Sequence, residues 1–314
     1  MNNALLIGCG SVGLKHLEVL KTFAKNIDIV DIKYISDFHK EDSDITQYSN
    51  INDINSKKRY ELIVIATWAN SHYELLKKCI RFKPKGIIIE KPLSNSIKSC
   101  QEIIEIAEEN GINILCNFTR SISIMSNEIE KYFSLNNDEI LAMKWETSGN
   151  CLATNGIHWY NLAENIFNSA ATKATGKTYL VKENPRSPDL NFLQGHLTFD
   201  FNNGKKLFLS TEKKIQDNYI YFKGNNTKVR LTGNTLELEQ NGSYEEILKL
   251  SFNFSTELLK IYHEVLNPSN INIYNIKSTE NFLCLVIPLI YEIESSIKLY
   301  DNLKDFNEIE VPLS

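Results

Sequence analysis

The sequence lacks the features that mark several large classes of protein. No apolar run approaches the roughly eighteen residues of a membrane-spanning helix, and the N-terminus enters a strand pattern without the regions of a signal peptide. No block of Lys and Arg is present that would follow a phosphate backbone, and the formal net charge is −5. We therefore expect a cytoplasmic protein that binds neither membranes nor nucleic acid.

Patterns for disulfides and metal ligands are missing as well. The six cysteines contain no C-x-x-C pair and lie mostly in apolar stretches, which is typical of reduced, buried thiols. The six histidines are scattered without the spacing of metal ligands. The sequence therefore predicts no metal site.

What is present is an ordinary globular composition with a distinctive N-terminus. The 314 residues are 42% hydrophobic and 23% charged, which is enough chain for two domains. A buried strand is predicted over residues 4–7, then Gly8-Cys9-Gly10-Ser11-Val12-Gly13, then an amphipathic helix. This order of strand, G-x-G-x-x-G and helix is the one that dinucleotide binding requires.

Each residue type in this motif has a physical reason. Gly8 permits a tight turn, Gly10 lets the backbone approach a pyrophosphate, and Gly13 lets the helix pack closely on the sheet. The N–H groups of the first helical turn, at Ser11 and Val12, face the phosphates with the positive end of the helix dipole. The alternative is that three glycines simply make a turn in a domain without a nucleotide.

Asp31 ends a second predicted strand, over residues 27–31. A carboxylate at this place accepts hydrogen bonds from the adenine ribose hydroxyls and repels a 2′-phosphate. The sequence therefore predicts NAD in preference to NADP, a preference that Lys33 tempers.

Further strand and helix patterns alternate along the first part of the chain. Strands are predicted over residues 61–67, 86–89 and 112–118, which indicates a parallel, doubly wound sheet. Ser71 and Glu74 form a capping-box pattern for the helix after the first of these strands. The loop at Trp68 follows the same strand, at the sheet edge where ligands bind in open α/β sheets.

The second part of the chain has a different pattern. Helices are predicted over 126–133, 155–167, 255–266 and 279–300, with Pro288 as a kink, and a long irregular loop between 169 and 194. Alternating strands follow at 196–201, 206–211, 219–223, 228–231 and 235–239. We expect an α/β protein with a Rossmann domain at residues 1–120 and a C-terminal α+β domain at 121–314 whose open sheet is mostly antiparallel.

Glu90-Lys91-Pro92 directly follows a buried strand pattern and is the most specific motif in the chain. Together with the glycine motif and the Ala66-Thr67…His72 loop, it resembles the glucose-fructose oxidoreductase, inositol dehydrogenase and rhizopine catabolism family, Gfo/Idh/MocA. The resemblance covers nearly the whole chain. It implies NAD(P)-dependent hydride transfer at a hydroxyl-bearing carbon of a sugar, cyclitol or nucleotide sugar.

The same resemblance implies roles for individual residues. Thr67, Trp68, His72 and Glu90 belong to the cofactor site, and Lys91 lies beside the nicotinamide and contacts the reacting hydroxyl. A cation or proton acceptor is needed there because the oxygen gains alkoxide character as hydride leaves the carbon. The alternative for Lys91 is a lysine that merely reaches solvent from the end of a strand.

A second family signature, D-x-G-x-H-x-x-D, is altered in this chain. The corresponding stretch runs from Thr154 to Asn161, keeps His158 and lacks both acids. Thr154 takes the place of an acid in the proton relay and cannot hold a charge that orients an imidazole. We predict His158 and Thr154 as catalytic residues, Asn155 and Tyr160 as substrate contacts, and keep open that His158 is a satisfied histidine at a helix start.

Several residues are further candidates for substrate contact. Asn117 lies near the end of the strand that closes the first domain, and Arg120 follows this strand. Arg120 can clamp a carboxylate or phosphate with two hydrogen bonds. A salt bridge between domains is the alternative role for Arg120. Arg186, Lys213 and Lys214 are additional candidate contacts for an anion.

Three hypotheses for function remain. The first is an NAD-dependent oxidoreductase acting on a sugar, sugar acid or nucleotide sugar. The second, motivated by Thr154 and Asn161, is a nucleotide-binding sensor or assembly subunit without dehydrogenase activity. The third is an enzyme that holds NAD tightly for elimination or isomerisation. Family members commonly assemble through the exposed face of the C-terminal sheet, so the resemblance also implies a homodimer or homotetramer.

Overall fold

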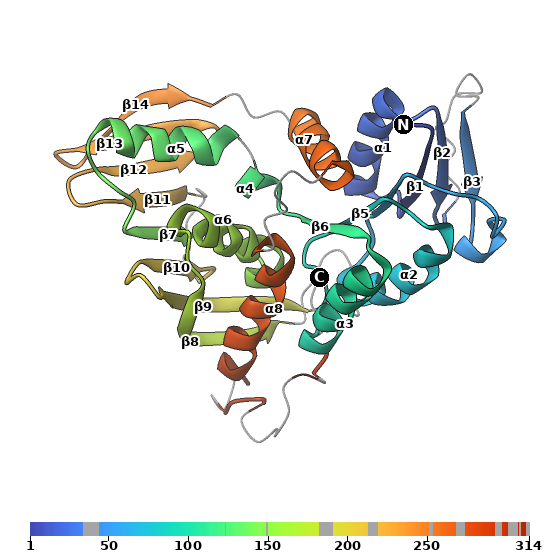
Figure 1. Cartoon of the computed structure of the whole chain (residues 1–314). Helices are drawn as coiled ribbons and strands as arrows, with labels where there is room; N and C mark the ends of the chain where they lie inside the picture. Colours follow the sequence, from blue (N-terminus) through green and yellow to red (C-terminus); the bar gives the residue numbers. More distant parts are fainter. Residues whose placement is uncertain are drawn as a thin grey trace. The chain divides into compact units, whose positions relative to one another are not determined.

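In the computed structural model the described residues are 1–33, 44–122, 124–148, 150–181, 191–212, 219–250, 254–267, 274–292, 297–300, 307 and 309–311. They belong to two compact units, each built around its own sheet (Figure 1). Unit 1 comprises Met1–Thr119 and Asn253–Ile276, and unit 2 comprises Arg120–Phe252 and Lys277–Ser314. Among the described residues, no helix is both long and apolar enough to cross a membrane.

Unit 1 contains the predicted parallel sheet. Its strands run in the order β3-β2-β1-β4-β5-β6 and all neighbouring pairs are parallel. Their bounds are β1 Asn3–Ile7, β2 Asn26–Val30, β3 Ile45–Tyr48, β4 Leu62–Ile65, β5 Gly86–Glu90 and β6 Asn113–Asn117. Every residue of β4 and β5 is buried, as expected for central strands covered on both faces.

Helices α1 Ser11–Phe23, α2 His72–Cys79 and α3 Ile97–Asn110 connect these strands. Helix α3 begins where Ser96 Oγ accepts a hydrogen bond from the Ser99 amide at 3.1 Å and ends at Gly111, whose φ is +61°. The capping box predicted for α2 is wrong. The Ser71 hydroxyl donates back to the Trp68 carbonyl at 2.7 Å and does not cap the helix.

The fourth helix of unit 1, α7 Phe254–Leu266, comes from a distant part of the sequence. It packs on α1, β5 and β6, and its Tyr262 is fully buried. By its place in the sequence, this helix is expected in the C-terminal domain. The structure groups it with unit 1 because its apolar face completes the core over α1 and the end of the parallel sheet.

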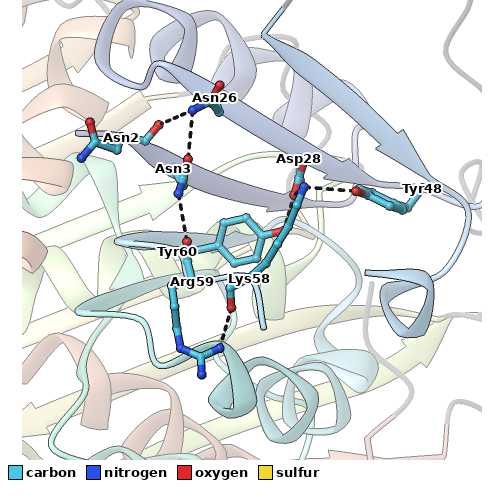
Figure 2. Close-up of polar contacts among 8 residues, drawn as sticks. All are labelled: Asn2, Asn3, Asn26, Asp28, Tyr48, Lys58, Arg59 and Tyr60. Carbon is cyan, nitrogen blue, oxygen red and sulfur yellow. Dashed lines mark hydrogen bonds and ion pairs between the residues drawn. The ribbon is translucent and has the colours of Figure 1, made fainter. Parts of the chain in front are cut away.

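A polar cluster lies toward the amino ends of these strands (Figure 2). The buried Asp28 of β2 accepts hydrogen bonds from Tyr60 and, at 2.5 Å, from Lys58, which also donates to Tyr48 at 3.1 Å. The side-chain amides of two asparagines make further hydrogen bonds nearby. Asn26 donates to the Asn2 carbonyl and the Asn3 side chain, and Asn3 donates to the Arg59 carbonyl. These bonds link β1, β2 and β3 to the segment before β4 and give the buried Asp28 carboxylate its hydrogen-bond donors.

Unit 2 is built on a nine-stranded sheet in the order β14-β13-β12-β11-β7-β10-β9-β8-β15. The pairs β7–β10 and β8–β15 are parallel and the others are antiparallel, so the expected mostly antiparallel sheet is confirmed. The strands are β7 Ala142–Glu146, β8 Ala171–Val181, β9 Phe192–Phe201, β10 Lys206–Ser210, β11 Tyr219–Lys223, β12 Lys228–Thr232, β13 Thr235–Gln240, β14 Ser243–Lys249 and β15 Ile290–Tyr291.

Unit 2 contains α5 Ile124–Leu135, α6 Ile157–Phe167 and most of α4 Thr119–Ile122 and α8 Tyr274–Val286, whose first residues fall in unit 1. Residues of β9 alternate between buried and half-buried, so one face of the sheet forms the core. In that core Tyr160 of α6 contacts Phe199 of β9 and Phe282 of α8, with ring centroids 4.9 and 5.4 Å away. The sheet thus fixes α6, the helix that carries the altered signature.

Three expectations for unit 2 need correction. The predicted loop after residue 169 contains β8, whose lysines and threonines suit a strand with one exposed face. Strand β14 was not predicted, because its charged residues hide the alternation. The last predicted helix ends at Val286, because Pro288 falls in the 3₁₀ turn that follows and cannot continue a helix.

Candidate functional site

The glycine motif forms a tight loop between β1 and α1. Gly8 has a φ of +86°, and a Cβ on it would lie 2.5 Å from the Ala66 carbonyl oxygen. A Cβ on Gly13 would lie 2.1 Å from the Gly8 carbonyl oxygen, so this glycine allows the close helix–strand approach. A Cβ on Gly10 would meet no atom within 4 Å. Gly10 therefore borders open space, as a position facing a pyrophosphate must.

The start of α1 suits an anionic group. Gly10 is its N-cap residue, no side chain caps the helix, and the first turn holds no acidic residue. Ser11 and Val12 are exposed in that turn. The amide groups of such a turn and the positive end of the helix dipole attract phosphate. The loop of this chain thus fits the pyrophosphate of a dinucleotide.

Asp31 lies directly after β2, beside the glycine loop. Its Oδ2 accepts a hydrogen bond from the Cys9 amide at 2.7 Å and its Oδ1 accepts one from the Lys33 amide at 2.8 Å. Each carboxylate oxygen has a second lone pair left for a ribose hydroxyl. Burial, and then the charge of Asp31, raise the pKa of the Cys9 thiol to about 11, so this cysteine remains an unreactive thiol.

The loop after β4 holds the next predicted cofactor residues. The Thr67 hydroxyl is hydrogen-bonded to the Ser71 hydroxyl at 2.7 Å, and the Trp68 side chain is 44% exposed. His72 is fully buried, with Nε2 3.1 Å from the Thr67 carbonyl oxygen and Nδ1 3.1 Å from that of Leu93. We infer that His72 acts on a cofactor only by joining the two loops and not by direct contact.

Burial lowers the pKa of His72, despite the carbonyl oxygens around it. The imidazole is therefore neutral at physiological pH. A neutral imidazole carries a single N–H, so it donates to one of the two carbonyl groups.

Glu90 is the last residue of β5 and is 7% exposed. Its Oε1 lies 2.9 Å from His16 Nε2 and accepts a hydrogen bond from Asn117 Nδ2 at 2.5 Å. Burial alone would raise the pKa of this carboxyl, but His16, Lys91 and Asn117 outweigh burial and lower it. Glu90 is thus a buried carboxylate that keeps its charge.

Lys91 and Asn117 are the polar neighbours of Glu90 at this strand end. Lys91 comes directly after Glu90 and is half-buried, and the peptide bond between Lys91 and Pro92 is cis. Asn117 ends β6, where it pairs with Glu90 in register, and its side-chain Oδ1 is buried without a hydrogen-bond partner. Glu90 and Lys91 therefore stand at the carboxyl end of β5 and Asn117 at that of β6, where open α/β sheets bind ligands.

In unit 2 the altered signature forms a helix start. Residues Leu152–Gly156 make a π-helical turn that leads into α6. Thr154, Asn155 and His158 are half-buried there, and the Thr154 hydroxyl donates to Asn155 Oδ1 at 3.2 Å. π-Turns often occur at functional sites. Thr154 and Asn155 thus form one polar group near His158 in the sequence.

Arg120 and Trp159 make a second contact in unit 2. The Arg120 guanidinium lies 4.1 Å from the centroid of the Trp159 ring. Burial lowers the pKa of Arg120 to about 10, which leaves it a cation at neutral pH. The stacking on Trp159 holds this cation in place.

Tyr160 does not suit its predicted role. It is fully buried in the aromatic core between Phe199 and Phe282, so it belongs to the scaffold and not to a substrate surface. Its place directly after His158 and Trp159 in a helix turns it to the sheet side. Asn161, which replaces the second acid, is also fully buried, and donates to Ser278 Oγ at 2.8 Å.

Sequence reasoning missed three buried residues. His16 and Tyr262 contact the Glu90 group, and Glu164 of α6 is 2% exposed with Ser278 and Asn281 as partners. The one available signal was His16 on the apolar stripe of the first helix. Arg186, Lys213 and Lys214 lie outside the described residues. Within the described residues, no group of three His, Cys, Asp or Glu is placed to hold a metal ion.

Solved structures show a fold like that of this chain. A complex of the 3-ketoreductase KijD10 from Actinomadura kijaniata with TDP-benzene and NADP is 14% identical, with a TM-score of 0.73 over 93% of this chain and 98% of that one. Myo-inositol 2-dehydrogenase from Lactobacillus plantarum is 17% identical, with a TM-score of 0.69 over 90% and 95%. Biliverdin reductase from Synechocystis, with biliverdin and NADP+, is 12% identical, with a TM-score of 0.71 over 90% and 96%.

At these identities the likeness concerns the fold. No curated protein is similar enough in sequence to count as a relative. Two of the similar structures hold NADP, so they lend no support to a preference for NAD.

The family comparison concerns unit 1. Residues 2–118 match the model of the Gfo/Idh/MocA family, described as "Oxidoreductase family, NAD-binding Rossmann fold". The matched segment contains the open glycine loop, Asp31 and the Glu90–Lys91 pair. Residues 2–118 of this chain therefore form a domain that matches the NAD-binding Rossmann fold of the Gfo/Idh/MocA oxidoreductase family.

Proposed function

We propose that this chain transfers hydride to or from a hydroxyl-bearing carbon of a sugar, sugar acid or nucleotide sugar. The observation that carries the proposal is Lys91, a half-buried cation directly after a charged, buried glutamate at the ligand edge of a dinucleotide-binding sheet. Two of the similar structures support the proposal by their names, a 3-ketoreductase in complex with TDP-benzene and NADP and a myo-inositol 2-dehydrogenase.

A bound nicotinamide would supply the hydride acceptor or donor. The residues of the chain then have to manage the proton on oxygen. We propose that Lys91 hydrogen-bonds the reacting oxygen and stabilises its alkoxide character, and that His158 serves as the acid–base partner. Thr154 and Asn155 offer a hydroxyl and an amide oxygen for substrate hydroxyls, but no charge.

The test is turnover on a panel of nucleotide sugars, sugar acids and cyclitols with NAD(H) and NADP(H). Once a substrate is found, Lys91→Ala should lower turnover at least about a hundredfold. NADH binding should survive in that variant. Lys85→Ala is the matched control, because Lys85 precedes the same strand and is exposed. Equal turnover of Lys91→Ala and the wild type would refute the role of Lys91.

We further propose NAD as the preferred cofactor, on the strength of Asp31 alone. Its carboxylate would repel a 2′-phosphate beside the glycine loop. Asp31→Asn keeps an acceptor for one of the two backbone amides and removes the charge. We expect this variant to narrow the preference for NADH over NADPH by about tenfold, as measured by direct titration. An unchanged preference would remove Asp31 from the explanation.

The sensor hypothesis remains as the second candidate because of Thr154 and Asn161. Both positions lack the charge of the family signature, and Asn161 is occupied by buried hydrogen bonds. A sensor would bind cofactor saturably and oxidise or reduce nothing on the panel, and one clear turnover would end this hypothesis. An enzyme with tightly held NAD would instead keep the cofactor through purification without consuming it.

We also propose a cytoplasmic homodimer or homotetramer. All six cysteines are among the described residues and none forms a disulfide, which suits a reducing compartment. The open face of the sheet of unit 2 carries half-buried aromatic side chains, with Arg230 3.6 Å from the Tyr244 ring centroid. Sedimentation should give an oligomer that Tyr221→Glu, on the same face, weakens about tenfold or more. A wild-type monomer would refute the proposal.

A further inference from the structure

Four buried polar side chains of unit 1 form a line of hydrogen bonds that includes Glu90, the residue directly before Lys91. Tyr262 Oη lies 2.7 Å from His16 Nδ1, and His16 Nε2 lies 2.9 Å from Glu90 Oε1. Asn117 Nδ2 completes the line with a hydrogen bond of 2.5 Å to the same Glu90 oxygen. Tyr262 and His16 are fully buried, and Asn117 is 2% exposed.

The acceptor at one end fixes the protons along the line. A charged carboxylate only accepts hydrogen bonds, so His16 Nε2 must carry a proton where it faces Glu90. Burial, with the Glu90 charge, raises the pKa of Tyr262 well above its ordinary value, so this phenol keeps its proton. The Tyr262 hydroxyl can then donate to His16 Nδ1, which selects the imidazole tautomer that donates to Glu90.

The line joins three separate parts of the sequence at one strand end. His16 belongs to α1, directly after the glycine loop, and Glu90 and Asn117 end β5 and β6. Tyr262 comes from α7, 246 residues after His16. Helix α7 thus reaches the ligand edge of unit 1 through a hydrogen bond as well as through packing.

We propose that Tyr262, His16 and Asn117 are positioning residues that hold Glu90 charged and fixed in place, and that Glu90 in turn holds the Lys91 ammonium ready for the reacting oxygen. The catalytic part of this inference rests on the proposed function. The electrostatic part does not, because the charge of Glu90 acts on its neighbour whether or not a substrate is turned over.

The groups that titrate near Glu90 come from four elements, and an experiment must account for all of them. They are His16 of α1, His72 of α2, Tyr262 of α7 and Lys91 itself. Burial holds His72 and Tyr262 neutral, so Lys91 is the cation next to the carboxylate in the sequence and His16 is the imidazole that donates a hydrogen bond to it.

The test is the pH dependence with which Lys91 reacts with acetic anhydride, read by mass spectrometry of the peptide that contains it. Glu90→Gln removes the charge and should move the midpoint of labelling to lower pH by at least about half a unit. His16→Leu removes the donor and should move the midpoint in the same direction. His16→Gln, which keeps a side-chain N–H, should restore part of the difference.

Tyr262→Phe should shift the labelling midpoint of Lys91 in the same direction by a smaller amount, because His16 then lacks the hydrogen bond that selects its tautomer. Tyr60→Phe is its matched control: it also deletes a buried phenol hydroxyl of unit 1, one that is bonded to Asp28 and not to this line. Equal midpoints in the wild type, Glu90→Gln and His16→Leu would overturn the inference, as would equal shifts in Tyr262→Phe and Tyr60→Phe.

The outcomes separate this inference from the proposed function. A shifted midpoint without turnover on any substrate supports the positioning line and counts against the oxidoreductase reaction. Turnover that needs Lys91, with a midpoint that none of these variants moves, supports the reaction and overturns the line. Where turnover is found, we expect Tyr262→Phe to lower kcat at least about threefold with little change in KM for NADH.

Discussion

Glu90 of unit 1 and Glu164 of unit 2 are both buried in polar groups, and the two environments act in opposite directions. Glu90 of unit 1 meets His16 and Asn117, and its pKa is lowered despite burial. Glu164 of unit 2 meets neutral groups, among them the Ser278 hydroxyl and the Asn281 amide, and burial raises its pKa to about 7. Burial sets the cost of a charge, and a neighbouring cation decides whether the charge is kept.

The comparison also separates the two family motifs, Glu90-Lys91-Pro92 in unit 1 and the altered signature in unit 2. In unit 1, where the family model matches, the charged motif has its partners. In unit 2, Thr154 and Asn161 replace acids, and the remaining buried acid, Glu164, lies against hydroxyl and amide groups. The buried carboxylate that keeps its charge therefore lies in unit 1, next to Lys91, and the altered signature offers His158 without an acid.

The largest expected effect comes from breaking the pair in unit 1. His16→Leu leaves the charge of Glu90 buried without its histidine hydrogen-bond donor, and should lower the free energy of unfolding of unit 1 by about 3–5 kcal/mol at pH 7. Hydrogen exchange of α1 and β5 peptides measures this unit by itself. Protection as high as in the wild type would show that Glu90 does not depend on His16.

A slightly smaller effect is expected from Glu164→Gln, and it should depend on pH. The folded-state pKa of about 7 lies above the ordinary 4.5, so the folded state holds a proton that the unfolded chain has lost. The contribution of Glu164 to stability is therefore fully present below about pH 4.5 and is lost as pH rises through 7. Glu164→Gln should stabilise unit 2 by about 3 kcal/mol at pH 8 and change little at pH 4.

Tryptophan fluorescence can follow this in unit 2. Trp145 and Trp159 are both in that unit, so a Trp68→Phe background reports its urea unfolding alone. Glu245→Gln removes the same charge at an exposed position of β14 and serves as the control. A wild-type stability that does not fall between pH 5 and pH 8 would contradict the difference between the two glutamates.

The smallest effect is expected from the two phenol deletions in unit 1. Tyr262→Phe and Tyr60→Phe each remove one buried hydrogen bond and should each lower stability by about 1–2 kcal/mol. Thermal melting measures both. A similar loss of stability, with an effect on Lys91 only in Tyr262→Phe, sharpens the contrast between a positioning group and a structural one. A much larger loss in either variant would show that its hydroxyl does more than make one bond.

The sequence predicts what local patterns encode. The glycine motif, Asp31 and Glu90-Lys91 are short stretches between strong strand and helix patterns, and the parallel sheet follows from their alternation. The mostly antiparallel sheet is visible from alternating residues and turn glycines. These elements are predictable because their cause lies within about ten residues of each.

What the sequence does not predict depends on distant contacts. The hydrogen bond between His16 and Tyr262 spans 246 residues, and nothing near either residue indicates it. The assignment of α7 to unit 1 has the same cause. The burial of His72 and Tyr160 follows from tertiary packing, which a motif does not describe.

The central claim is that a nicotinamide dinucleotide binds at the glycine loop, and Gly10 tests it most directly. Its φ of −74° is open to any residue and a Cβ there meets nothing, so Gly10→Asp should fold normally while its carboxylate repels the pyrophosphate. Lys25→Ala, an exposed change of equal net charge at the other end of α1, is the control.

The measurement is titration with NADH and NADPH, followed by nicotinamide fluorescence, on these two variants and the wild type. We predict saturable binding to the wild type and Lys25→Ala, and affinity at least about a hundredfold weaker for Gly10→Asp with an unchanged melting temperature. Equal affinity of Gly10→Asp and the wild type, or no binding of either cofactor to the wild type, would contradict the account.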